Sequence, residues 1–147
     1  MKARRKARAL ALQALYELDF TRHTVDSVLE HLLLGEGDLN AETSDFVRRL
    51  VHGVHKSAPL LDQLIHRHAP EWPLSQMAVI DRNILRLAIW EFAIDRQTPT
   101  KVAINEAVEL AKMFGSDNAP RFVNGVLGTL AAHENDLVQA LAKQARP

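Results

Sequence analysis

The chain has 147 residues, of which 47% are hydrophobic and 24% charged, a composition typical of a single soluble globular domain with its own core. It contains no cysteine, which excludes disulfide bonds and thiolate metal sites, and its N-terminus lacks the apolar core of a signal peptide, so we expect a cytoplasmic protein. The formal net charge is zero, which argues against a surface that coats nucleic acid broadly but permits a small, focused basic patch.

The first predicted helix, residues 3–19, carries such a patch. Its apolar residues follow the i, i+3, i+4, i+7 spacing of an amphipathic helix. The cations of the first eight residues are Lys2, Arg4, Arg5, Lys6 and Arg8. Cations near a helix N-terminus are slightly unfavourable, because that end already carries partial positive charge. The patch is therefore either a solvated helix end or a binding site for phosphate, and an aromatic ring two turns further on, Tyr16, favours binding.

The next predicted helices span residues 25–34 and 42–68. Residues 24–47 hold six acidic residues and no lysine or arginine, which is most simply a solvated face. Pro59 either kinks one long helix or occupies the first turn of a new one. His52 and His55 are three residues apart and could share a helix face, but no further ligand accompanies them, so surface or packed histidines are predicted rather than a metal site.

Residues 77–94 form the predicted central helix of the fold. Its second half is apolar on nearly every side, which is typical of a helix surrounded by other helices. Polar residues interrupt the run, which falls short of the ~18 consecutive apolar residues of a membrane span. We expect Ser75 to cap this helix. Asp81, Arg82 and Asn83 are predicted to form an exposed polar shoulder that contacts a partner.

Three further helices are predicted at residues 101–114, from Pro120 to about residue 131, and at 134–145. Thr100 is the expected cap of the first of them, and a turn at residues 116–120 separates it from the second. Asn105 and Asn124 lie among apolar residues and are predicted to be buried and hydrogen-bonded to nearby helix ends. No strand-like alternation occurs, so the sequence predicts an all-α fold of about seven helices in one domain, residues 1–147.

No catalytic motif accompanies these helices. The sequence has no glycine-rich phosphate loop, metalloprotease histidine pair or nucleophile elbow. Glu106 and Glu109 are spaced like a carboxylate pair, but we interpret them as ordinary helix-forming residues. The protein is therefore not expected to be an enzyme or to hold a cofactor.

A binding function is better supported. Arg121 and Phe122 begin a predicted helix directly after a turn, Phe114 ends the preceding helix, and Lys101 stands at the start of that one. A helix N-terminus, a cation and an aromatic ring can together hold a phosphate and stack an unpaired base. This combination favours single-stranded RNA over duplex. For Phe122, packing in the core against Val126 is at least as good an interpretation.

Four blocks of the sequence resemble the NusB family of transcription antitermination proteins, in the order and spacing of that family. The blocks are residues 4–17 (RRKARALALQALYE), 81–91 (DRNILRLAIWE), 103–115 (AINEAVELAKMFG) and 121–127 (RFVNGVL). Residues 21–75 resemble the family only in helical pattern. Gly128 stands where an acidic residue is common, and the tail beyond Ala131 is longer than expected and receives no function.

The resemblance implies an all-α fold of two packed halves. It also implies binding of the boxA element of ribosomal RNA transcripts together with NusE, a protein of the small ribosomal subunit, and read-through by RNA polymerase. The implied RNA contacts are Lys2, Arg4, Arg5, Lys6, Arg8, Gln13, Tyr16, Lys101, Phe114, Ser116, Asp117, Asn118, Arg121 and Phe122. The implied protein contacts are Asp81 and Arg82.

The sequence leaves two other functions to compare. The same fold occurs as the N-terminal domain of a ribosomal RNA cytosine methyltransferase, which needs a further nucleotide-binding domain that we do not expect in this chain. The alternative to RNA binding is a helical scaffold without RNA affinity, which engages a partner through Asp81 and Arg82 or forms a homodimer.

Overall fold

The protein is all-helical in its computed structural model, which describes the backbone of residues 2–145 and the side chains of residues 3–143. No strand occurs within this part of the chain. The elements in order are α1 (Lys2–Phe20), α2 (Val25–Glu36), α3 (Ala41–His68), the 3₁₀ turn η1 (Leu74–Gln76), α4 (Val79–Ile89), the π-helical segment η2 (Trp90–Asp95), α5 (Thr100–Phe114), α6 (Ala119–Ala131) and α7 (Glu134–Ala145). The predicted all-α class with about seven helices is confirmed.

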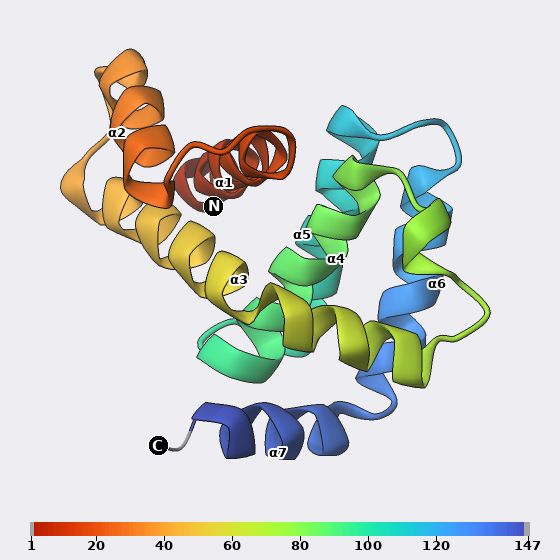
Figure 1. Ribbon diagram of the computed structural model, residues 1–147. Coiled ribbons are helices and arrows are strands. Elements are labelled where there is room, and N and C mark those ends of the chain that lie inside the picture. Colours follow the sequence, from red (N-terminus) through yellow and green to blue (C-terminus); the bar gives the residue numbers. More distant parts are fainter. Residues whose placement is uncertain (1, 146–147) are drawn as a thin grey trace.

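The long helix α3 joins two groups of helices. Figure 1 shows α1 and α2 beside its first half and α4, α5 and α6 grouped toward its second half. The two groups meet where α1 packs on α4 and α5. α7 lies across one end of the bundle, where it contacts η2 and α6. This is the predicted arrangement of two packed halves.

The centre of the core is α4 with η2, which confirms the predicted central helix. Ile84, Leu85 and Ile89 are fully buried, and the indole of Trp90 packs on α3 at Gly53. A Cβ atom added to Gly53 would lie 2.3 Å from the Trp90 ring, so only glycine permits this close approach. No helix within residues 2–145 combines the length and apolar character needed to cross a membrane.

Helices α2 and α3 begin at side-chain caps, and α3 is continuous. Thr24 Oγ1 accepts a hydrogen bond from the Ser27 amide at 3.1 Å, and Asn40 Oδ1 accepts one from the Thr43 amide at 2.8 Å. Each cap satisfies one of the free amides of a helix N-terminus. Pro59 lies inside α3 rather than at the start of a new helix.

The caps predicted at Ser75 and Thr100 were wrong. Ser75 lies in η1, and α4 begins after Ala78, which makes no side-chain capping bond. Pro99 occupies the cap position of α5. Thr100 is the first residue of that helix, and its hydroxyl donates a hydrogen bond to the Glu134 carboxylate of α7 instead. A hydroxyl used between helices is no longer free to cap its own helix.

The predicted burial of Asn105 and Asn124 was also wrong, since both side chains are exposed. The buried positions of α5 are Ala103, Glu106, Ala107, Leu110 and Ala111. Successive residues of an α-helix are about 100° apart around its axis. Asn105 therefore lies on the side of α5 opposite to this buried face. The inward stripe predicted for this helix agrees with the buried positions only in part, at Ala107 and Ala111, and Val102, which was also predicted to point inward, is exposed.

Asn83 departs from the predicted exposed shoulder, because it is fully buried. Its Nδ2 donates to Asp19 of α1 at 2.7 Å, and its Oδ1 accepts from Arg86 Nη1 at 3.0 Å. Arg86 in turn donates to both oxygens of Asp62 on α3, at 2.8 and 2.6 Å. A chain of charge-assisted hydrogen bonds thus joins α1, α4 and α3.

The two histidines considered as metal ligands are both exposed on α3. His52 Nε2 lies 3.3 Å from Asp26 Oδ1 of α2. Among the described residues, no three side chains of metal-binding type gather at one place. We therefore interpret both as surface histidines.

Candidate nucleic-acid interface

Helices α1 and α5 approach each other at two places, which brings the two main blocks of predicted RNA contacts together. Arg5 donates to Glu106, 101 residues further along the chain, at 3.0 and 3.2 Å. Two to three turns along both helices, Tyr16 and Phe114 line one groove. The cations at the start of α1 therefore lie at one end of this helix pair, and the aromatic rings lie at the other.

The basic end is held by neighbouring side chains. The Arg4 guanidinium lies 4.0 Å from the ring centroid of Phe46 on α3, a cation–π contact, and its Nη2 lies 3.8 Å from Glu42 Oε1. Lys6 Nζ lies 3.1 Å from Glu36 Oε2 at the end of α2. Arg4, Lys6 and also Arg5 retain side-chain exposures of 43%, 54% and 47%, so an RNA phosphate can reach all three. The side chain of Lys2 lies outside the described residues.

Arg8 does not belong to this accessible patch, contrary to the prediction. Only 6% of its side chain is exposed. Its Nε and Nη2 donate to the two oxygens of Glu91 at 2.9 and 2.8 Å, and its Nη1 lies 3.7 Å from Glu106. Thr98 donates a further hydrogen bond to Glu91 at 3.1 Å. Because both partners are buried and fully paired, Arg8 fastens α1 to η2 and α5 rather than facing RNA.

Glu106 likewise differs from its predicted role as an ordinary helix-forming residue. It is 3% exposed, and its carboxylate forms ion pairs with both Arg5 and Arg8. Its neighbour Glu109 is half-buried and, among the residues whose side chains are described, pairs only with Lys112 on its own helix, at 3.2 Å. The spacing of the two acids carried no sign of this difference, because the partners of Glu106 lie about 100 residues away in sequence.

The aromatic end contains an apolar groove of about 200 Å³ between α1, α4 and α5. Its lining residues are Ala9, Leu12, Gln13, Tyr16, Ile80 and Phe114. The rings of Tyr16 and Phe114 are 43% and 47% exposed. An apolar groove bordered by exposed aromatic residues is suited to stacking of unpaired bases.

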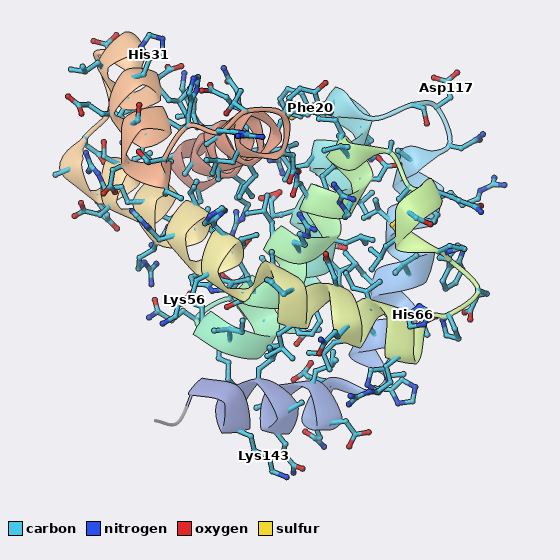
Figure 2. The ribbon with its side chains drawn as sticks, in the orientation of Figure 1. Phe20, His31, Lys56, His66, Asp117 and Lys143 are labelled. Atoms are coloured by element: carbon cyan, nitrogen blue, oxygen red, sulfur yellow. The ribbon has the colours of Figure 1, made fainter. Side chains whose placement is uncertain are left out.

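Phe20 was missed by the sequence analysis. It is 61% exposed, and its ring centroid lies 4.7 Å from that of Tyr16. Figure 2 shows it at the same end of the molecule as Asp117 in the turn between α5 and α6. The signal that could have found it is the i, i+4 spacing of two aromatic residues on one helix.

A second cleft, of about 340 Å³, separates the η1 region from the turn before α6. It is lined by Trp72, Pro73, Gln76, Met77, Ala78, Asp81, Ser116, Asn118, Ala119 and Phe122. The half-buried Phe122 ring packs edge-on against Trp72 at 6.3 Å, so it serves the core and also borders the cleft. Ser116 and Asn118, predicted to contact RNA, share this cleft with Asp81, predicted to contact a protein.

Asp81 and Arg82 are only partly exposed. Asp81 Oδ1 is buried without a hydrogen-bond partner, and burial raises the pKa of this carboxyl group. Arg82 Nη2 lies 3.8 Å from Asp19 Oδ2. Both side chains therefore keep hydrogen-bonding capacity that the described part of the chain does not use fully.

Lys101 is not near the turn with which the sequence analysis grouped it. It begins α5, whereas Phe114 ends that helix, and 13 residues of α-helix separate them by about 20 Å. Lys101 is exposed, and its neighbour Val102 lines a pocket together with Arg4. It therefore belongs to the basic end. Asp117 and Arg121 are exposed in and after the turn at the aromatic end.

Comparison with known proteins agrees with this architecture. A family model described as the NusB family matches residues 5–132. The chain belongs to the NusB family. The transcription antitermination protein NusB of Roseiflexus sp. strain RS-1 is similar to it, with 53% identity over 131 residues that cover 88% of this chain and 92% of that protein. The family match ends just before α7, which begins at Glu134.

Solved structures of NusB proteins share the fold. T. maritima NusB aligns with a TM-score of 0.80 at 34% identity, covering 88% of this chain and 90% of that one. The structure of antitermination factors NusB and NusE in complex with double-stranded RNA aligns with a TM-score of 0.80, covering 88% of this chain and 96% of that one. At 23% identity, the second likeness concerns the fold alone.

Proposed function

We propose that this protein is a transcription antitermination factor that binds single-stranded boxA RNA of ribosomal RNA transcripts together with NusE. It acts in the cytoplasm, promotes read-through by RNA polymerase, and carries no enzymatic activity of its own. Membership of the NusB family supports this proposal. The structural observation that carries it is the surface formed by α1 and α5, with accessible cations at one end and exposed aromatic rings at the other.

In this proposal, the basic end holds the RNA backbone. Arg4, Arg5, Lys6 and Lys101 offer charge to phosphates, which makes binding sensitive to salt but largely independent of sequence. We assign Lys2 to the same end. Phosphate contacts fix the position of the strand, and the aromatic end then decides which bases are tolerated.

The aromatic end receives unstacked bases. Tyr16 and Phe114 provide the stacking surfaces, and Gln13 brings an amide to the edge of their groove. The exposed turn and the following helix start supply polar contacts and a further ring, through Ser116, Asp117, Asn118, Arg121 and Phe122. Base recognition thus depends on residues from two elements that only the fold brings together.

In this proposal, NusE binds next to the RNA. Asp81 and Arg82 are the proposed protein contacts, and Asp81 lines the cleft that Ser116 and Asn118 also border. A protein seated there would lie within reach of the same RNA strand. Because two linked contacts bind more tightly than either alone, the partner should strengthen RNA binding without a large new patch on this chain.

The test is fluorescence anisotropy with a labelled boxA RNA and a scrambled RNA, each titrated with and without NusE. We expect tighter binding to boxA, and the double variant Tyr16→Ala/Phe114→Ala should lose at least about 10-fold in boxA affinity. Leu34→Ala is the matched control, because Leu34 is 75% exposed on α2 and far from this groove in the fold. Equal, weak binding to both RNAs in every condition would contradict the proposal and favour the protein-interaction scaffold instead.

A further inference from the structure

Each cation of the α1 N-terminal region whose side chain is described lies within 4 Å of a carboxylate oxygen. The pairs are Arg4 with Glu42, Arg5 with Glu106, Lys6 with Glu36, and Arg8 with Glu91. The acids come from α2, α3, α5 and η2, so four separate elements supply them. A segment that the sequence presents as a basic patch is thus largely neutralised by the fold around it.

The four pairs fall into two kinds. Glu91 and Glu106 are 2% and 3% exposed, and each accepts two or more hydrogen bonds from an arginine. An RNA phosphate cannot displace such acids without opening the junction between the two halves. These inner pairs are part of the fold.

The outer pairs, by contrast, are open to exchange. Glu42 is 83% exposed at its side chain and 3.8 Å from Arg4, and Glu36 is 28% exposed and 3.1 Å from Lys6. Exposed ion pairs contribute little to stability. Arg4 does not depend on Glu42 for its position, because the Phe46 ring holds its guanidinium. A phosphate can therefore replace Glu42 while Arg4 stays where it is, and it can reach and pair with the 54% exposed side chain of Lys6 in place of Glu36.

We propose that Glu36 and Glu42 are built-in competitors of RNA, which occupy Lys6 and Arg4 in the free protein and lower its affinity for any RNA backbone. The inference rests on the proposed function, since it assigns a role to acids beside the proposed RNA site. A phosphate must displace a carboxylate at each of these two cations before it gains a contact. The weakened backbone contribution makes stable binding depend more strongly on base contacts at the aromatic end.

The competition predicts a specific change when the two acids are neutralised. The variant Glu36→Gln/Glu42→Gln should bind boxA RNA and scrambled RNA about 2- to 30-fold more tightly, by similar factors, because phosphate contacts do not depend on sequence. The RNA affinity of the variant should also fall more steeply with salt concentration. In the wild-type complex, the two displaced carboxylates take up counterions and so reduce the net counterion release, whereas the variant lacks these carboxylates.

The matched control removes the same two charges from the same acidic part of the chain. Glu30 and Asp38 are exposed, and within the described residues neither pairs with a cation of α1. The variant Glu30→Gln/Asp38→Asn should change the affinity for either RNA by less than about 2-fold. An equal gain in this control would show a general charge effect and overturn the inference.

The remaining outcomes separate the two proposals. If the wild-type protein binds boxA RNA and Glu36→Gln/Glu42→Gln binds with equal or lower affinity, the competition is wrong and the proposed function stands. If neither protein binds RNA at any salt concentration, the proposed function fails and the inference fails with it. Thermal unfolding of each variant, followed by circular dichroism, verifies that the fold is intact in every comparison.

Discussion

Arg5 of α1 donates two hydrogen bonds to the buried carboxylate of Glu106 on α5, at 3.0 and 3.2 Å. This contact sets the alignment of the two helices that carry the proposed RNA site. It also gives Glu106 a role that its neighbour Glu109 lacks, although the two acids look alike in sequence.

Replacing Glu106 by glutamine should lower the free energy of unfolding by about 1–3 kcal/mol. The change removes the charge that balances Arg5 and, more distantly, the buried Arg8. Urea denaturation measures the effect. Glu109→Gln, on the same helix but with only an exposed local partner, should stay within about 0.5 kcal/mol of the wild type. Equal stability of the two variants would contradict the role assigned to Glu106.

Arg8→Ala should destabilise the protein by about 3–5 kcal/mol, because it leaves Glu91 buried and unpaired. Arg5→Ala should cost less stability, since half of the Arg5 side chain is exposed, but should weaken RNA binding directly. Denaturation and RNA anisotropy on the two variants test this division. If the Arg8→Ala protein is as stable as the wild type and defective only in RNA binding, Arg8 contacts RNA and the structural role assigned to it is wrong.

The contact between the end of α3 and the turn before α7 should make stability depend on pH. The rings of His68 and His133 stack with centroids 4.6 Å apart, and burial, followed by the nearby His133 and Arg67, lowers the pKa of His68 below its ordinary value of 6.5. The folded chain therefore binds this proton less tightly than the unfolded chain. The contribution of neutral His68 to the free energy of unfolding is therefore fully present above pH 6.5. It is lost as the pH falls from there through the lowered pKa.

Denaturation midpoints between pH 7.5 and 5 measure this dependence. His68→Phe keeps an aromatic ring against His133 but cannot take up a proton, so its midpoint should change less over that range than the wild-type midpoint. His31→Gln, at an exposed position of α2, serves as the control and should follow the wild type. An unchanged pH profile in His68→Phe would refute the assignment.

Gly53→Ala should destabilise the fold by about 1–3 kcal/mol, because the added Cβ would lie 2.3 Å from the Trp90 ring and force the core apart. Gly128→Ala is the opposite case. Gly128 is an exposed residue of α6 with nothing within 4 Å of an added Cβ, so alanine should stabilise the helix by about 0.5–1 kcal/mol. Thermal or urea unfolding of both variants checks the difference in sign.

Local patterns were sufficient to predict the helices and their central element, because amphipathic periodicity is a property of neighbouring residues. They were not sufficient to predict which polar residues are buried. Arg8 and Asn83 find their partners on other helices, 83 and 64 residues away in sequence. A cation in a basic run and an asparagine beside two charged residues both look exposed until those partners are known.

The candidate site was predictable in its parts but not in its arrangement. Tyr16 and Phe114 were expected as separate contacts, and the fold places them in one groove. Lys101 was combined with the turn after α5 because a cation, a helix start and an aromatic ring suit RNA, whereas the 15 residues of α5 place it at the opposite end. Residues at the two ends of a helix of this length lie about 20 Å apart, so they cannot belong to the same end of the surface.

The surface formed by α1 and α5 has a direction. A strand of RNA runs from a 5′ to a 3′ end, and the two ends of this helix pair differ, one charged and the other aromatic. A strand laid in one orientation presents a given base to the rings of Tyr16 and Phe114, and the same strand reversed presents it to the cations. An RNA of identical composition with its sequence written backwards would therefore be a different ligand, even though every phosphate contact were preserved.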